Sequence, residues 1–160
     1  MDDLLIDFNR VLVEAAARLG AVPADRAARP VEGGWSAAQI LGHLIDSAAN
    51  NHQRFVRAQF IDHLDFPGYD QEQWVAAQRY DREPWPQLLA LWLAYNRHLA
   101  HVVAAIPPAV LTAPRARHSL DRIAWQLVPA DQPATLEYLI RDYLGHLQAH
   151  LQQLYQTLED

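Results

Sequence analysis

The chain of 160 residues contains no cysteine and no lysine. Without cysteine there are no disulfides, thiolate metal ligands, iron–sulfur clusters or cysteine nucleophile, so a metal site must use histidine, aspartate or glutamate. All 13 basic residues are arginine, and 19 acidic residues give a net charge of −6. An acidic chain without a basic cluster is a poor partner for nucleic acid or anionic membranes, and we predict neither.

Long hydrophobic runs are also missing. No stretch approaches the roughly 20 continuous apolar residues that span a bilayer. The first residues, Met1-Asp2-Asp3, are acidic where a secretory signal peptide is basic. We therefore expect a soluble cytoplasmic protein with no membrane partner, whose length fits one domain over residues 1–160.

Four segments have apolar side chains at steps of three and four residues, which is typical of amphipathic helices. These segments are residues 2–19, 37–61, 85–106 and 136–158. Ser36 begins a Ser-x-x-Gln capping box for the second helix, and Thr135 is the predicted N-cap of the fourth. The pattern predicts an all-α fold, a four-helix bundle with long connecting loops.

The connections are less regular than the helices. Residues 70–80 predict a short helix in which Trp74 faces inward, and residues 109–133 predict either a short strand pair or a functional loop. Tyr69 and Trp74 are candidates for one wall of a substrate pocket. We nevertheless interpret all five tryptophans as core or helix-junction residues: Trp35, Trp74, Trp85, Trp92 and Trp125.

The eight histidines are where chemistry is expected in a chain without cysteine. His146 and His150 are four residues apart on the fourth predicted helix, so their rings project from one face, within its apolar arc. That spacing suits one metal ion, but each ring could instead bind a buried carbonyl, carboxylate or water. His43 is the natural third ligand, and three inward histidines from two helices would leave open coordination positions for catalysis.

The other polar candidates leave two interpretations open. One side of the second helix carries residues that form either a solvated edge or the lining of a cleft: His43, Asp46, Ser47 and Asn50. His98 and His101 flank the apolar stripe of the third helix and are expected on its surface. Three histidines lack a partner at useful spacing and are expected to be solvated: His52, His63 and His118.

Two motifs resemble those of a known family. One is the run Gly34-Trp35-Ser36-Ala37-Ala38-Gln39-Ile40-Leu41-Gly42-His43-Leu44-Ile45-Asp46-Ser47, and the other is Asp142-Tyr143-Leu144-Gly145-His146-Leu147-Gln148-Ala149-His150. They are similar to the G-W-S-x-x-Q-x-x-x-H-x-x-D-S and H-x-x-x-H patterns of the DinB-like superfamily, also called the YfiT-type metal-dependent hydrolases. Residues 69–74 and 78–80 also resemble that family, so the resemblance covers nearly the whole chain.

The resemblance implies an up-down-down-up four-helix bundle with a three-histidine site for a divalent metal. Carried over by position, the ligands are His43, His146 and His150. All-nitrogen ligation suits zinc, nickel or iron. The family includes transferases and isomerases that use low-molecular-weight thiols such as bacillithiol and mycothiol, besides proteins described as hydrolases. Its members are often homodimers, and we expect the same here.

As an enzyme, the protein would use the metal to activate water or a low-molecular-weight thiol, for hydrolysis or thiol transfer on a small-molecule substrate. Asp46 would orient the His43 ring or act as a general base, and Asp142 would orient His146 or be solvated. The residues expected to contact substrate are Asn50, Tyr69 and Trp74.

Two alternatives involve no turnover. In the first, a dimeric bundle uses the metal only to hold the second and fourth helices together. In the second, the histidines are satisfied core residues and the bundle is an interaction protein.

Overall fold

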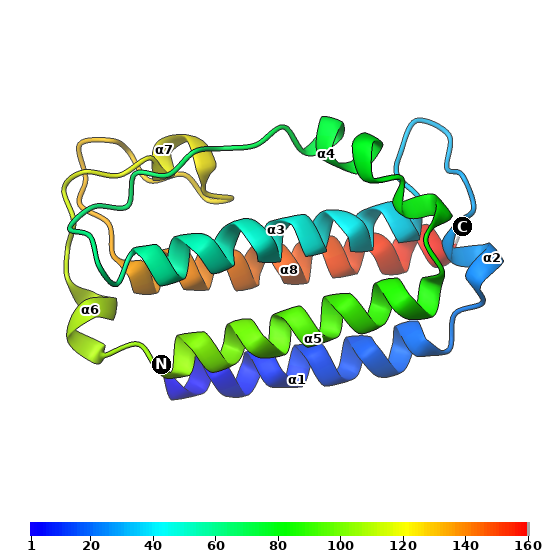
Figure 1. The fold of residues 1–160 in the computed structure, drawn as a ribbon, viewed down its shortest axis with the longest axis horizontal. Helices are drawn as coiled ribbons and strands as arrows, with labels where there is room; N and C mark the ends of the chain where they lie inside the picture. The colour runs from blue at the N-terminus through cyan, green and yellow to red at the C-terminus, as the bar shows by residue number, and fades with distance from the viewer. Residues whose placement is uncertain (160) are drawn as a thin grey trace.

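Four long helices dominate the computed structural model, which describes residues 1–159 (Figure 1). They are α1 (Asp2–Gly20), α3 (Ala37–Arg57), α5 (Trp85–Ala104) and α8 (Leu136–Glu159). The colour gradient in Figure 1 shows that α1 and α8 run in one direction and that α3 and α5 run in the opposite direction. The predicted all-α, up-down-down-up four-helix bundle is confirmed.

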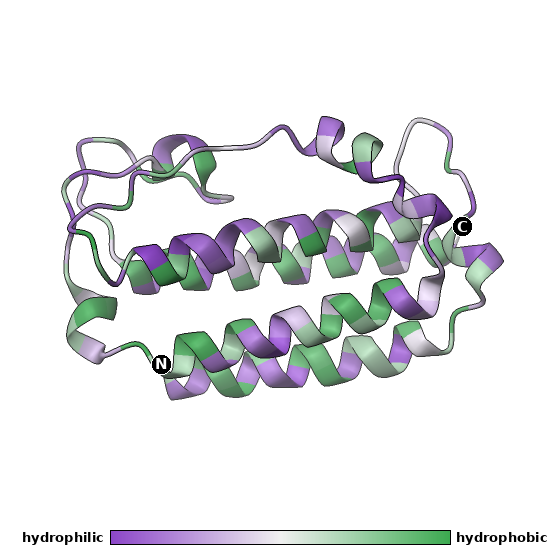
Figure 2. Ribbon diagram, viewed as in Figure 1, coloured by the Kyte–Doolittle hydropathy of each residue, from purple (hydrophilic) through white to green (hydrophobic). Residues whose placement is uncertain are grey.

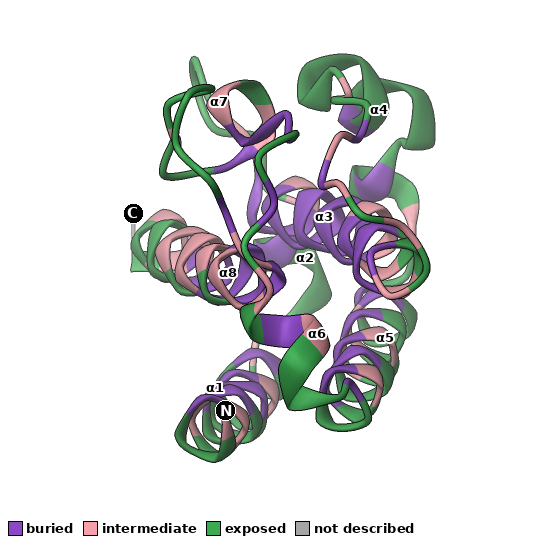
Figure 3. Ribbon diagram, turned by 90° about the vertical axis from the view of Figure 1, so that its left-hand side faces the viewer, coloured by how far each residue is buried: buried purple, intermediate pink, exposed green. Residues whose placement is uncertain are grey.

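The end-on view shows how the helices neighbour one another (Figure 3). Both α1 and α3 pack against α5 and α8, so α1 and α3 occupy opposite corners of the bundle. Each long helix carries hydrophobic and hydrophilic residues (Figure 2), and the buried hydrophobic residues of all four form one cluster. The fully buried Phe8 and Phe55 illustrate its strength, since burying such a side chain contributes about 1.5–3 kcal/mol.

Tyr143 of α8 ties the four helices together at the centre of the bundle. Its ring packs edge-on against Phe8 of α1 and Phe55 of α3, at centroid distances of 6.1 and 5.8 Å. Its hydroxyl donates a hydrogen bond to the side-chain oxygen of Asn96 in α5. Tyr143, three residues before the H-x-x-x-H motif, therefore fixes α8 relative to every other long helix.

The predicted caps of α3 and α8 are confirmed. Ser36 Oγ accepts from Gln39 N at 3.2 Å, while Gln39 Oε1 accepts from Ser36 N at 2.9 Å. Thr135 Oγ1 accepts from Tyr138 N at 3.1 Å. However, α3 ends at Arg57 and not near residue 61, because the chain leaves the helix and pairs with residues 117–119.

Five shorter helices lie in the connections: α2 (Ala24–Ala27), α4 (Gln71–Gln78), η1 (Tyr80–Arg82), α6 (Pro108–Thr112) and α7 (Leu120–Ile123). The two long connections, residues 58–84 and 105–135, contain isolated bridges at Leu64–His118 and Arg115–Ala134. Of the two alternatives predicted for residues 109–133, the strand pair does not form, since there is no strand within residues 1–159. Segments of both connections, including α4 and α7, lie together on the α3 side of the bundle (Figures 1 and 3).

The tryptophans only partly follow the predicted core interpretation. Trp85 and Trp92 are buried, but Trp74 and Trp125 are 39% and 47% exposed. Trp74 does not face inward because Val75 occupies the buried position of α4. None of the helices in residues 1–159 has both the length and the apolar character that a membrane crossing requires.

Two of the predictions for the remaining histidines have clear outcomes. His98 and His101 are exposed, as predicted. His118 is buried, and the prediction of a solvated ring is wrong. Its Nδ1 accepts from Leu120 N at 3.2 Å, so Nε2 carries the proton and donates to Gln132 O at 2.7 Å. This ring therefore holds the 105–135 connection in shape.

A test of this packing uses Gly42, where a Cβ atom would overlap the ring of Tyr80. We predict that Gly42→Ala lowers the free energy of unfolding by about 1–3 kcal/mol, because the buried ring must move. Gly20 is the matched control, because no atom lies within 4 Å of its Cβ position. Thermal and urea unfolding should show Gly20→Ala unchanged or slightly stabilised, and equal behaviour of the two variants would contradict the packing.

Candidate metal centre

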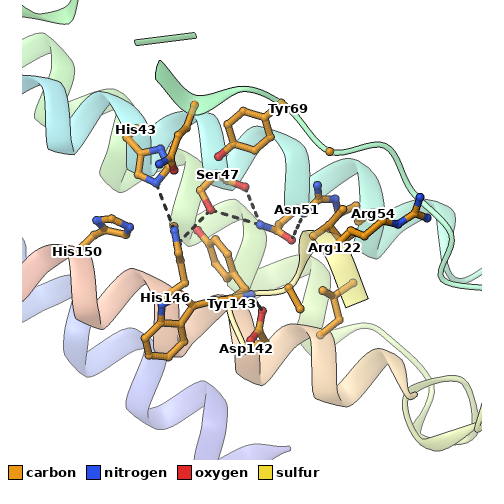
Figure 4. Close-up of a pocket in the computed structure, with 16 residues that line it drawn as sticks. His43, Ser47, Asn51, Arg54, Tyr69, Arg122, Asp142, Tyr143, His146 and His150 are labelled. Carbon is orange, nitrogen blue, oxygen red and sulfur yellow. Dashed lines mark hydrogen bonds between the residues drawn. The ribbon is translucent and has the colours of Figure 1, made fainter. Parts of the chain in front are cut away.

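Three histidines meet where α3 and α8 pack together (Figure 4). His43 comes from α3, and His146 and His150 come from successive turns of α8. Each offers one ring nitrogen such that the three atoms lie within 4.8 Å of one another. The structure thus brings together the three residues that the sequence suggests as ligands.

Two of these rings contact a neighbouring polar side chain through Nδ1. Nδ1 of His146 lies 3.4 Å from Ser47 Oγ, and Nδ1 of His150 lies 2.8 Å from Gln153 Oε1. Such contacts fix the ring orientation and leave Nε2 for a ligand. The Nε2 atoms of His43 and His146 face each other at 3.3 Å.

On its Nδ1 side, the ring of His43 is held by packing instead of by a hydrogen bond. Its Nδ1 is buried without a hydrogen-bond partner within residues 1–159. The ring of Trp35 lies against it at a centroid distance of 5.2 Å. Trp35 Nε1 in turn donates to Glu72 of α4 at 3.1 Å. The tryptophan of the G-W-S motif therefore forms one side of the cluster.

Burial keeps the three imidazoles neutral. It lowers the pKa of His43 to about 4, with a smaller contribution from His150. Burial, followed by His150 and His43, lowers the pKa of His146 to about 3, and burial also lowers the pKa of His150. Neutral imidazole is the form that binds a metal ion.

One pair of donors has the spacing that a divalent metal requires. Tetrahedral coordination with metal–nitrogen bonds of about 2.05 Å places neighbouring ligand nitrogens about 3.3 Å apart. The observed separation between the Nε2 atoms of His43 and His146 is 3.3 Å. The chain therefore holds this pair of nitrogens at the spacing that a shared ion requires.

Glycines next to two of the histidines allow aromatic rings to approach the helix backbones. Gly42 precedes His43 and contacts Tyr80, while a Cβ at Gly145, which precedes His146, would lie 2.9 Å from the Trp125 ring. Both helices thus contain the tripeptide Gly-His-Leu. The mid-helix glycines beside His43 and His146 were a signal in the sequence for these aromatic contacts. Sequence reasoning missed that signal.

Asp46 is directed toward the 58–84 connection. Its Oδ1 accepts hydrogen bonds from Tyr80 Oη and Gln78 Nε2, both at 2.7 Å. Burial raises the pKa of its carboxyl group, and these two hydrogen bonds oppose the rise. No hydrogen bond joins Asp46 to His43 in the described structure. Asp46 fixes the tyrosine that packs beside His43.

Asp142 binds the backbone of the 105–135 connection. Its carboxylate oxygens accept from the backbone N–H groups of Trp125 at 2.9 Å and Gln126 at 2.7 Å. No hydrogen bond joins Asp142 to His146 in the described structure, and the carboxylate is half-buried instead of fully solvated. Asp142 holds the residues after α7 against α8.

A pocket of about 430 Å³ opens beside the histidines, and all three of them line it. Tyr69 also lines it, and burial raises the pKa of its phenol to about 12. Trp74 lies behind Tyr69, with ring centroids 4.9 Å apart, and is not part of the lining. Asn50 is also outside the lining and donates to Asp46 O at 2.9 Å.

Further along the pocket, α3 contributes Ser47, Asn51 and Arg54 (Figure 4). Asn51 and Arg54 were not among the candidate site residues. Their spacing from His43, through steps of four, four and three residues, is a helical stripe that was visible in the sequence. Asn51 lines the pocket, and the neighbouring Asn50, which the sequence suggested, does not.

Comparison with solved structures finds YfiT from Bacillus subtilis, described as a probable metal-dependent hydrolase with an unusual four-helix bundle topology. The match has a TM-score of 0.73 and 18% sequence identity, and covers 96% of this chain and 85% of that chain. At this identity the likeness shows the fold. No curated protein matches the chain. The model of the DinB superfamily matches residues 7–154, and the chain therefore belongs to the DinB superfamily.

Proposed function

We propose that this chain is a metal-dependent enzyme that acts on a small molecule, with a divalent ion held by His43, His146 and His150. The observation that carries the proposal is that all three histidines line a pocket of about 430 Å³. An ion that only joined α3 to α8 would need no such opening. The description of YfiT as a probable metal-dependent hydrolase supports the same conclusion.

The chain's own residues prepare the site for the ion. Ser47 and Gln153 contact Nδ1 of His146 and His150, which leaves Nε2 of each ring for the ion. Zinc, nickel or iron would suit three imidazoles. When bound, such an ion would polarise a substrate carbonyl or favour the deprotonated form of water or a thiol.

Residues of the pocket other than the three histidines have further roles in the proposed reaction. The phenol of Tyr69, with its pKa raised to about 12, stays protonated at neutral pH and serves as a hydrogen-bond donor to substrate. Trp74 supports the Tyr69 ring, and Asn51 takes the role first considered for Asn50. Asp46 acts through Tyr80 as a positioning residue beside His43.

The reaction that we propose is hydrolysis by activated water or transfer involving a low-molecular-weight thiol. Both place a nucleophile at the histidine cluster and a small substrate in the pocket. The alternative of a non-catalytic metal-binding bundle predicts an ion that neither thiols nor inhibitors reach. The homodimer and the cytoplasmic location stay predictions, to be tested by light scattering and by cell fractionation.

The ligand assignment predicts the metal content of variants. Untagged wild-type protein should contain about one equivalent of divalent metal by mass spectrometry, and His146→Ala should lose it without unfolding the bundle. His98→Ala is the matched control, since His98 is an exposed histidine of another helix. Full metal content in His146→Ala would contradict the assignment.

The proposed chemistry predicts activity that depends on the metal. Protein loaded with zinc, nickel or iron should turn over members of a panel of small esters, amides and thiol-reactive electrophiles, the last with an added thiol. Chelation or His146→Ala should reduce the rate at least about 100-fold, because the nucleophile loses its activation. Binding of one metal equivalent with no turnover, and no response of the metal to thiols, would favour the non-catalytic alternative.

Burial of the histidines also predicts how the stability of the metal-free protein depends on pH. Below pH 6.5 the unfolded chain protonates these rings, whereas the folded chain keeps His43 neutral to about pH 4 and His146 to about pH 3. Stability should therefore fall as the pH drops from 6.5 toward 4, by up to about 1.4 kcal/mol per pH unit for each such ring. Urea unfolding between pH 7 and 5 should show a smaller slope for His146→Ala, and a wild-type slope of zero would contradict the burial.

A further inference from the structure

Arg54 is a buried cation at the end of the pocket away from His150 (Figure 4). The residue is only 6% exposed. No carboxylate within residues 1–159 lies within ion-pair distance of it, although seven ion pairs form elsewhere. A buried charge is costly unless a counter-charge or hydrogen bonds compensate it.

The hydrogen bonds of Arg54 satisfy only part of its guanidinium. Nη1 donates to Asn51 Oδ1 at 3.3 Å and Nη2 donates to Pro67 O at 3.0 Å. A guanidinium has five N–H donors, arranged as a planar fork that matches a carboxylate or phosphate. At least part of this fork is left for a partner from outside the described chain.

A row of polar contacts along α3 leads from the histidines to this cation. Ser47 Oγ lies 3.4 Å from His146 Nδ1 and 3.4 Å from Asn51 Nδ2, and Asn51 Oδ1 contacts Arg54. Arg54 lies eleven positions after His43, which is about 16 Å along a helix axis. An elongated small molecule would therefore reach from one group to the other.

The charges of the lining favour an anion. The charged residues that line the pocket are Arg54, Arg122 and Asp142. Asp142 opposes an anion, because its carboxylate keeps its negative charge while it accepts the backbone N–H groups of Trp125 and Gln126. Arg122 is more exposed and lies 3.6 Å from Asp121 and 3.9 Å from Asp65, which offset its charge, so Arg54 is the cation of the lining that no ion pair within residues 1–159 compensates.

We propose that Arg54 binds an anionic group, a carboxylate or a phosphate, at the end of the substrate remote from the bond that reacts at the histidine cluster. This inference rests on the proposed function and names its substrate class, an elongated small molecule with a terminal anion. Arg54 then determines specificity, and Asn51 orients its guanidinium.

The test uses ω-mercapto carboxylates and ω-mercapto phosphonates of increasing chain length, with the neutral ω-mercapto amides as controls. Their affinities for cobalt(II)-loaded protein are measured from the absorption band of thiolate bound to cobalt. The best anionic probe should bind at least about tenfold more tightly than its amide, as expected for a charge-assisted hydrogen bond in a buried site. Whether carboxylate or phosphonate binds better identifies the anion.

Variants show whether Arg54 is responsible for that preference. In Arg54→Gln the preference for the anion should fall to about twofold or less, while affinity for the amide is kept. Arg57→Gln, the same change at an exposed position of α3, should keep the wild-type preference. Equal affinity for anion and amide in wild type, or a full preference in Arg54→Gln, would overturn the proposal.

One further measurement covers the case in which the variant or the metal loading fails. If Arg54→Gln does not fold, the Arg54 Nε–H resonance of metal-free wild type is followed in ¹⁵N spectra during titration with butyrate or propylphosphonate. A saturable shift at Arg54 supports the proposal, and its absence overturns it. Failure of cobalt or thiol to bind at the histidines would count against the proposed function alone, because the titration needs no metal.

Discussion

The contact between α3 and α8 requires three imidazole rings to share a buried space. His43, His146 and His150 cannot all be protonated there, because burial and mutual repulsion disfavour the charged forms. Neutral imidazoles offer one N–H each: His43 and His146 can share a hydrogen bond between their Nε2 atoms at 3.3 Å, but His43 Nδ1 is then buried without a partner in the described structure. A metal ion would accept one lone pair from each of the three rings in place of these hydrogen bonds. The cost of the arrangement without metal explains why so much of the surrounding structure holds the rings in place.

The two long connections provide much of that support. Their residues form the wall of the pocket opposite α3 and α8, and two acidic residues of those helices fasten them. Asp46 accepts hydrogen bonds from Tyr80 and Gln78 of the first connection, and Asp142 accepts the backbone amides after α7 in the second. Glycines beside His43 and His146 let Tyr80 and Trp125 approach the helix backbones. The positions of the histidines therefore depend on segments that are distant from them in sequence.

The helices and the histidine cluster were predictable because their signals are local. Spacings of three and four residues, the Ser36 capping box and the interval between His146 and His150 depend only on helix geometry. The end of α3 and the roles of Asp46 and Asp142 were not predictable, because each depends on a partner more than ten residues away. Trp74 shows the same limit, since only the folded connection determines that Val75 takes the buried position. Asn51 and Arg54 were within reach, because they continue the polar stripe of His43 and Ser47 along one face of α3.

The central claim, that the three histidines hold one ion with coordination positions left open to the pocket, is tested most directly by X-ray absorption spectroscopy at the metal edge. The account predicts three imidazole ligands, at about 2.0–2.1 Å if the metal is zinc, together with one or more light atoms from solvent. Adding a small thiol should replace solvent by sulfur at about 2.3 Å, without loss of an imidazole. A spectrum with fewer than three imidazoles, or one that no thiol or other small ligand changes, would contradict an open three-histidine site.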